Sequence, residues 1–185
     1  SPLRETLLEL VDFDLINTKA VHFSVGAVNA LSGNFVYFDN TLEAITPEHV
    51  MASGALPPAF PTVQIGTEHY WDGAIVSNTP LQHLLNQEDT LNSLIFQVDL
   101  FSSRGPMPRT MQDVMGRHKD IMYSSRTRYT TDLFQQLQGW KKQAHRALTH
   151  IPDASLSEED RSLRDALALI PEHTILQLIY QQKSY

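Results

Sequence analysis

The sequence has no cysteine among its 185 residues, which excludes disulfide bonds and thiolate metal sites. It has no apolar run long enough to span a bilayer and no signal-peptide pattern at its start, and a cytoplasmic location is compatible with the lack of cysteine. None of the eight histidines shows metal-ligand spacing, so we expect neither a metal nor a cofactor. The net charge of −7 and the lack of a recognised motif argue against nucleic acid as a partner.

Charge is unevenly distributed along the chain. Residues 1–103 carry a net charge of −10, residues 104–146 carry +6, and residues 147–185 carry −3. A basic segment can steer a protein toward anionic surfaces such as phospholipid headgroups, which would place it peripherally at a membrane. The alternative is a solvated helical face that complements the acidic part of the same chain. We favour this alternative, because charged runs usually have that role.

Apolar periodicity and turn residues predict alternating helices and strands. We predict helices over residues 3–11, from Thr46-Pro47 to before Pro57, from Thr79-Pro80 to Leu85 and over 156–169, and strands over 20–31, 34–38, 63–65, 69–71, 94–98 and 174–180. The strands at 20–31 and 34–38 flank Ser32-Gly33-Asn34 and form a predicted hairpin. The run at 94–98 is nearly continuously apolar, which is typical of a parallel strand covered on both faces. The fold class is therefore α/β with a mostly parallel sheet.

The composition changes after Arg104-Gly105-Pro106. Residues 110–149 contain no proline and carry apolar residues at helical spacing, which predicts two helices, or one helix interrupted near Thr130-Thr131. Methionines at positions 107, 111, 115 and 122 can form an adaptable apolar surface for acyl chains. Residues with this spacing are more often part of the core, and we favour a core here.

Asp72-Gly73 follows the second of two short strands predicted around Gly66-Thr67. A glycine directly after the aspartate lets another group approach the backbone closely, and the carboxylate stands at the end of a strand. In α/β sheets, ligands and catalytic residues collect at strand ends. An Asp-Gly pair is also a common turn, and the dipeptide alone favours that simpler interpretation.

Several motifs occur in a fixed order around Asp72. They are Ala52-Ser53-Gly54-Ala55-Leu56-Pro57-Pro58-Ala59-Phe60-Pro61, Trp71-Asp72-Gly73-Ala74 and Asn78-Thr79-Pro80-Leu81. Their order and spacing resemble the second half of the patatin-like phospholipase family, and residues 24–29 with 33–38 resemble a bacterial subgroup of it. The resemblance implies a partial three-layer α/β/α fold. Residues 1–104 would be the C-terminal part of the catalytic domain, and residues 105–185 a mainly helical extension with a closing strand.

By the same resemblance, Asp72 is the base of a Ser-Asp dyad that hydrolyses carboxylic esters of lipids. The serine of that family stands in a Gly-x-Ser-x-Gly nucleophile elbow, and a glycine-rich loop stabilises the oxyanion. This sequence contains neither element. Ser24 belongs to a predicted strand and Ser53 to a helix end, so we interpret both as structural, and we interpret His83 as a helix-surface residue.

The missing serine leads to an expectation about how the chain is used. The resemblance implies that the nucleophile and the oxyanion loop lie upstream, and a start at Ser1-Pro2 without an initiating Met agrees with a processed or cleaved chain. We expect this chain alone to be inactive. It would pair with the N-terminal half of the same protein or with a second copy, because an incomplete sheet leaves a hydrophobic edge. The alternative is a non-catalytic fragment that binds lipid or a protein partner.

Overall fold

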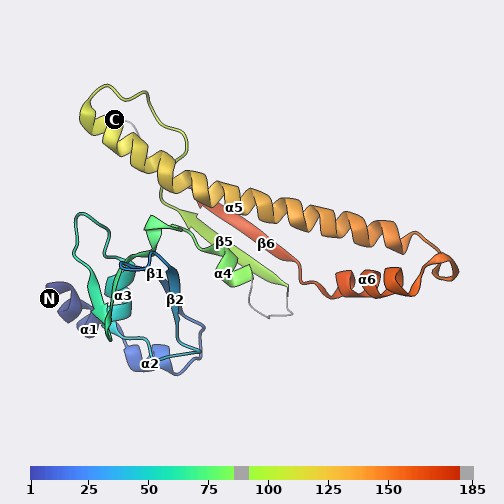
Figure 1. The fold of residues 1–185 in the computed structure, drawn as a ribbon, viewed down its shortest axis with the longest axis horizontal. Coiled ribbons are helices and arrows are strands. Elements are labelled where there is room, and N and C mark those ends of the chain that lie inside the picture. Colours follow the sequence, from blue (N-terminus) through green and yellow to red (C-terminus); the bar gives the residue numbers. More distant parts are fainter. Residues whose placement is uncertain (86–91, 180–185) are drawn as a thin grey trace. The chain divides into compact units, whose positions relative to one another are not determined.

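The computed structural model describes residues 1–85 and 92–179, without the side chains of residues 125 and 126. The chain divides into two compact units, Ser1–Asn78 and Thr79–Tyr185. Helices and strands occur in both units, and the C-terminal region is mainly helical, which confirms the mixed α/β class (Figure 1). The division into compact units does not test the predicted end of the catalytic domain at residue 104, which stays a prediction.

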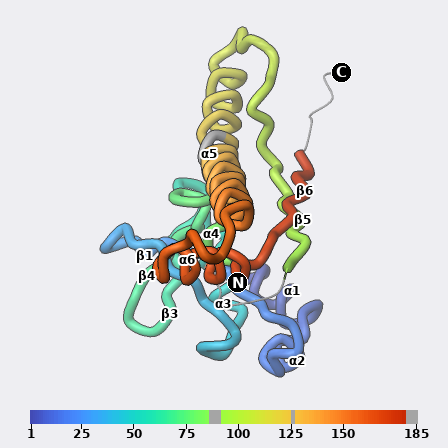
Figure 2. Tube along the Cα trace, turned by 90° about the vertical axis from the view of Figure 1, so that its right-hand side faces the viewer, coloured from blue at the N-terminus to red at the C-terminus, as the bar shows by residue number. Residues whose placement is uncertain are grey.

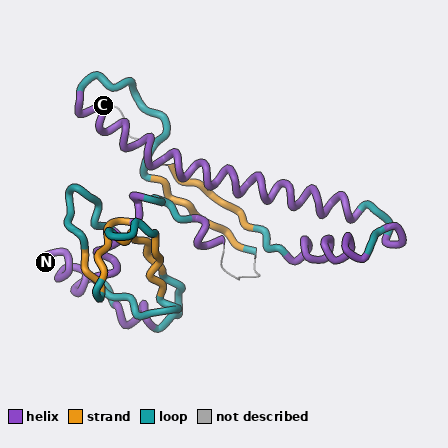
Figure 3. The backbone as a smooth tube through the Cα atoms, in the orientation of Figure 1, coloured by secondary structure: helices purple, strands orange, loops and turns teal. Residues whose placement is uncertain are grey.

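The first unit is a four-stranded sheet with three helices (Figure 3). Its elements are α1 (Pro2–Leu10), α2 (Phe13–Asn17), β1 (Ser24–Asn29), β2 (Phe35–Asp39), α3 (Pro47–Ser53), β3 (Val63–Ile65), β4 (Glu68–Asp72) and the 3₁₀ turn η1 (Gly73–Ile75). The strand order is β2-β1-β4-β3, so β4 lies inside the sheet and ends at Asp72. Periodicity did not predict helix α2, because five residues are too few to show it.

Local chemistry accounts for the start of α3. Pro47 occupies the first helical position, where its missing N–H costs no hydrogen bond. The ring Nδ1 of His49 accepts the backbone N–H of Thr46 at 2.9 Å and so closes the first turn. Helix α3 packs against β1, β3 and β4. The buried core on this face is formed by Ala27, Phe38, Ile45 and Ala52.

The expectation of a mostly parallel sheet is wrong for the strands that the structure describes. All three pairings in the first unit, β1–β2, β1–β4 and β3–β4, are antiparallel. Connection length explains two of these pairings, because short turns join β1 to β2 and β3 to β4, whereas a parallel pair needs a crossover of a dozen residues or more. Gly66 adopts a φ of +60° in the second of these turns, a conformation that favours glycine.

The second unit combines a parallel strand pair with long helices (Figures 1 and 2). Its elements are α4 (Leu81–Leu85), β5 (Ser93–Asp99), α5 (Met111–Thr149), the 3₁₀ turn η2 (Asp153–Ser155), α6 (Glu158–Leu169) and β6 (His173–Ile179). Strands β5 and β6 pair in parallel, and the chain crosses between them through α5 and α6. The predicted closing strand is confirmed as β6, whereas its predicted last residue, Tyr180, lies outside the described residues.

Helix α5 is continuous from Met111 to Thr149, so the interruption expected at Thr130-Thr131 is absent from the backbone of this helix. Threonine normally weakens a helix, but the hydroxyl groups of Thr127 and Thr131 bond to carbonyl groups one turn earlier in α5. The hydroxyl of Thr131 donates to the carbonyl of Thr127 at 2.9 Å and lies 3.0 Å from the side-chain oxygen of Gln97 in β5. Thr131 therefore faces the strand pair and ties the helix to β5.

The expected burial of β5 on both faces is also wrong for the described residues. Gln97 and Asp99 are buried on the face toward α5, whereas apolar side chains of the other face remain exposed. Exposure is 55% for Leu94, 62% for Phe96, 57% for Val98, 45% for Leu176 and 55% for Leu178. In the described part of this unit the sheet has two strands, so it offers an uncovered apolar face and two open edges.

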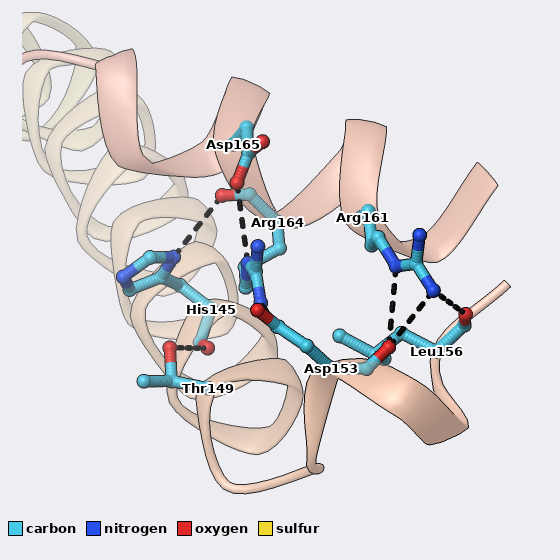
Figure 4. A network of polar contacts seen from close by, with 7 residues as sticks. All are labelled: His145, Thr149, Asp153, Leu156, Arg161, Arg164 and Asp165. Carbon is cyan, nitrogen blue, oxygen red and sulfur yellow. Dashed lines mark hydrogen bonds and ion pairs between the residues drawn. The ribbon is translucent and has the colours of Figure 1, made fainter. Parts of the chain in front are cut away.

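Two arginines of α6 hold the turn that joins it to α5 (Figure 4). Arg161 donates to the carbonyl of Asp153 at 2.9 Å and to the carbonyl of Leu156 at 3.1 Å. Arg164 forms an ion pair with the carboxylate of Asp153, and its own carbonyl lies 3.3 Å from Nδ1 of His145 in α5. The bonds to carbonyl groups fix the path of the turn, whereas an exposed ion pair adds little.

The methionines between 107 and 122 are exposed, so the interpretation of this group as core is wrong. Exposure is 85% for Met107, 75% for Met111, 68% for Met115 and 36% for Met122. These side chains belong to an outward-facing surface of the second unit. No helix within the described ranges combines the length and the apolar character that crossing a bilayer requires.

Candidate active site

Asp72 ends strand β4, and its neighbour across the sheet in β1 is Ala27. Because side chains alternate along a strand, the carboxyl group of Asp72 lies on the same face as Tyr70, which packs on the buried core. Trp71 points to the opposite face. The predicted strand-end position of Asp72 is confirmed, and the carboxyl group stands at the rim of the core of the first unit.

Two hydrogen bonds hold Asp72 in place, one at its backbone N–H and one at its side chain. Its backbone N–H donates to the carbonyl of Ala55 at 3.0 Å, which joins the motif at residues 52–61 directly to the motif at residues 71–74. Its Oδ1 accepts the N–H of Ala74 at 2.8 Å and so caps the turn η1. Within the described ranges, the other carboxylate oxygen has no hydrogen-bond partner. One oxygen is thus positioned by the backbone, and the second is free of such a bond.

Burial raises the pKa of the Asp72 carboxyl above its ordinary value of 3.8, and the hydrogen bond from Ala74 opposes this shift only in part. The side chain is half-buried at the rim of an apolar core, so the ionised form loses hydration that one N–H does not replace. A carboxylate that is harder to ionise holds a proton more strongly. That is the property a general base needs when it takes a proton from a hydroxyl group.

We expect Asp72→Asn to leave the free energy of unfolding at pH 7 unchanged or to raise it. A raised pKa in the folded state means that the stability contributed by the protonated form is present below 3.8 and is lost as the pH rises through the folded pKa. Asparagine is never ionised and can still accept the N–H of Ala74. Urea unfolding at pH 7 and at a pH below 3.8 measures this effect. A variant clearly less stable than the parent at pH 7 would contradict it.

Gly73 is required by the closeness of β1. A Cβ atom at this position would lie 2.7 Å from the carbonyl oxygen of Gly26 and 3.0 Å from the ring of Phe35. Gly73 is buried, so the backbone of β1 cannot move away without disturbing the sheet. The close approach expected from the Asp-Gly pair is therefore present. The sequence pattern did not single out Gly26 and Phe35, because only the sheet pairing brings them to Gly73.

Ser24 and Ser53, the two serines weighed as nucleophiles, do not have the surroundings that a nucleophile elbow requires. Ser24 is the first residue of β1 and pairs with Asp39 in the neighbouring antiparallel strand. Ser53 is the last residue of α3. An elbow needs a turn from a strand into a helix, and neither serine occupies one. His83 is the first histidine after Asp72 in the sequence, and it lies on α4 in the second unit.

A second carboxylate of the first unit, Asp39, is held by a dense set of hydrogen bonds that the sequence did not reveal. Burial alone would raise the pKa of this group, but hydrogen bonds from Thr41 and His22 together lower it well below its ordinary value. Oδ1 accepts both the N–H of Thr41, at 2.8 Å, and its hydroxyl, at 2.6 Å. Asp39 ends β2 and fixes the following turn, which is a structural role.

We expect Asp39→Asn to lower the free energy of unfolding at neutral pH by about 1–3 kcal/mol, because the hydrogen bonds from Thr41 and His22 lose their ionised acceptor. The folded-state pKa lies below the ordinary 3.8, so this stabilisation is present above that value and is lost as the pH falls through the folded pKa. Chemical unfolding between pH 2 and pH 7 tests it. An equal difference between parent and variant over the whole range would contradict the role assigned to the charge.

Two stretches of the chain match known protein families. Residues 1–85 match the family described as patatin-like phospholipase, and residues 121–185 match a second family, described as patatin phospholipase. The chain is patatin-like in both regions. The resemblance expected from the motifs around Asp72 is thereby confirmed. No curated protein gives a significant match.

Asp72 and the motifs that surround it lie inside the first patatin-like region. The second patatin-like region covers most of α5, together with α6 and the described part of β6, so the helical extension also matches a family described as patatin phospholipase. Both families are phospholipases, and the two matches indicate a lipid hydrolase. The family descriptions name a function class, and only the surroundings of Asp72 bear on the role of this residue.

Proposed function

We propose that Asp72 is the general base of a serine lipid acyl hydrolase, which cleaves carboxylic esters of lipids by a Ser-Asp dyad. The observation that carries the proposal is the state of this carboxyl group: half-buried, raised in pKa, with one oxygen fixed by Ala74 and the other without a hydrogen bond from the described residues. An aspartate that only caps the turn η1 needs the bond from Ala74 but neither the burial nor the raised pKa. The patatin-like match of residues 1–85 supports the same reaction class.

The chemistry assigns one proton to Asp72 in each half of the reaction. The serine hydroxyl attacks the ester carbonyl while Asp72 takes its proton, and the leaving alcohol then receives that proton as the acyl-enzyme forms. In the second half, Asp72 takes a proton from water, the hydroxide attacks the acyl-enzyme, and the serine oxygen is protonated again as the fatty acid leaves. Backbone N–H groups of a glycine-rich loop would stabilise the oxyanion in both halves.

The serine and the oxyanion loop belong, in this proposal, to an upstream half of the protein. The sequence of 185 residues contains no Gly-x-Ser-x-Gly, and Ser24 and Ser53 lack the surroundings of an elbow. The uncovered apolar face of the β5–β6 pair supports a further proposal, that another polypeptide completes this sheet. The upstream half of the same protein or a second copy of this chain would supply it.

Hydrolysis of a medium-chain p-nitrophenyl ester tests the proposal. The assay compares the 185-residue chain alone with a full-length protein, meaning one that includes the proposed upstream half. We expect turnover only in the full-length protein, abolished by a serine-directed phosphonate. Turnover by the 185-residue chain alone, blocked by the same reagent, would place the nucleophile within it. A full-length protein without any esterase activity would favour the alternative of a non-catalytic lipid- or protein-binding module.

A further inference from the structure

His49 stands at the start of helix α3 with its ring inside the first unit. The side chain is buried, and its ring packs on that of Phe38 in β2 with ring centroids 4.4 Å apart. Helix α3 itself packs against β1, β3 and β4. A titratable ring is thus enclosed between the helix and the sheet, where a positive charge is costly.

The hydrogen bonds of the ring define which nitrogen carries its proton. Nδ1 of His49 accepts the backbone N–H of Thr46 at 2.9 Å and lies 3.1 Å from the hydroxyl oxygen of the same residue. A backbone N–H only donates, so Nδ1 must be unprotonated and Nε2 must carry the hydrogen. Within the described residues, Nε2 has no hydrogen-bond partner. The neutral ring therefore acts as the acceptor that glutamate or glutamine supplies in a common helix cap.

Protonation of Nδ1 would remove this cap. The new proton occupies the lone pair that accepts the N–H of Thr46, so this N–H loses its partner. The ring also becomes a cation in a site that is only 5% exposed. Both effects favour an arrangement in which the start of α3 opens and the ring of His49 reaches water.

The charged groups around His49 offset this cost only in part. The carboxylate of Glu43 lies 3.7 Å from Nε2 but is half exposed, and Glu48 is bonded to Arg4 of α1 at 2.7 Å. Burial lowers the pKa of His49 below its ordinary value of 6.5, and the two carboxylates oppose this shift incompletely. Because the pKa is lowered in the folded state, the stability due to the neutral ring is present above 6.5. It is lost as the pH falls from 6.5 through the folded pKa.

Helix α3 also leads to the residue that holds the backbone of Asp72. Ala52 is fully buried on the core side of α3, and the carbonyl of Ala55, just after the helix, accepts the N–H of Asp72. The rings form a second connection, because Phe38 packs edge-on against Tyr70, two residues before Asp72 in β4. An opening of α3 would therefore disturb Asp72 both through its backbone bond and through the packing beside it.

We propose that His49 is an acid-sensitive positioning residue for Asp72. Its neutral ring holds the start of α3 closed, and its protonation opens α3 and loosens the bond between Ala55 and Asp72. The opening involves no chemistry at Asp72, so it is measured on the 185-residue chain without substrate. Only its consequence for catalysis, a loss of activity at mildly acidic pH, rests on the proposed function.

Hydrogen exchange of backbone amides, followed by NMR at pH 7.5 and pH 5.5, tests the proposal in the parent chain and in His49→Gln. Glutamine can accept the N–H of Thr46 but gains no charge in acid. The ratio of parent to variant exchange rates cancels the intrinsic effect of pH. From pH 7.5 to pH 5.5 this ratio should rise about five- to tenfold at residues 51–53 and at Asp72, because the open form binds a proton that the closed form resists.

The matched control is His69→Gln, which removes an exposed histidine of the same unit and should exchange like the parent at both pH values. Should His49→Gln not fold, the ring nitrogens of the parent decide: their NMR signals should show the Nε2–H form at pH 7.5. An exchange ratio that is independent of pH, a ring protonated on Nδ1 at pH 7.5, or an opening of α3 that leaves the amide of Asp72 protected would overturn the proposal. Full esterase activity of Asp72→Asn would remove the proposed function and leave the acid-sensitive opening of α3 standing.

Discussion

Replacing Asp72 with asparagine in the full-length protein is expected to reduce kcat/KM for ester hydrolysis by about 10²–10⁴-fold, the usual contribution of a positioned general base. Asparagine keeps the size of the side chain and the bond from the N–H of Ala74, so the turn η1 is preserved. It cannot take the proton of the serine. The loss should appear in kcat more than in KM, because the proton transfer occurs in the transition state and not in substrate binding.

The matched control is Glu68→Gln, at the first residue of the same strand. The carboxylate of Glu68 accepts a hydrogen bond from the side chain of Asn29 at 2.8 Å, and glutamine can accept the same bond. This variant should retain the kcat/KM of the parent protein. Equal activity of Asp72→Asn and the parent would remove Asp72 from the mechanism. Equal losses in both variants would indicate a general effect of altering β4.

Substituting Gly73 with alanine is expected to lower the free energy of unfolding by about 1–3 kcal/mol or more, the usual cost of overpacking a filled site. The added Cβ would stand 2.7 Å from a backbone oxygen of Gly26, which cannot rotate away as a flexible side chain can. Because Gly73 follows Asp72 directly, any backbone shift that relieves the clash also moves the carboxyl group. Esterase activity of the full-length protein should therefore fall together with stability.

Gly54→Ala is the matched control for this prediction. Gly54 follows α3 with a φ of −113°, and a Cβ there would meet no atom closer than 3.9 Å. Its substitution should change the free energy of unfolding by a few tenths of a kcal/mol at most, as expected for a compatible backbone position. Urea unfolding of the two variants beside the parent measures the difference. A stable Gly73→Ala protein with full activity would contradict the role assigned to the close approach of β1.

Features set by neighbouring residues were predictable from the sequence. The start of α3 at Pro47, the turn between β3 and β4, and the end of β4 at Asp72 all follow from residues within a few positions of each feature. The hairpin of β1 and β2 was predictable for the same reason, since alternation and a turn signal stand next to each other. The position of Asp72 at a strand end thus needed no knowledge of the tertiary fold.

Features that depend on distant partners were not predictable in this way. An apolar run such as residues 94–98 predicts a strand but not what covers it, and one face of β5 is exposed. The spacing of the methionines predicts a helix face, but it cannot say whether that face turns toward the strands or away from them. At the candidate site, the bond between Asp72 and Ala55 and the contact between Gly73 and Gly26 arise only when the sheet and α3 have assembled.

Labelling of the full-length protein by a fluorophosphonate, followed by mass spectrometry of its peptides, tests most directly whether Asp72 activates an upstream serine. We predict one modified serine, located upstream of the 185-residue chain, and a labelling rate that falls sharply in Asp72→Asn because the base no longer activates the hydroxyl. Modification of Ser24 or Ser53, or a labelling rate that Asp72→Asn leaves unchanged, would contradict it.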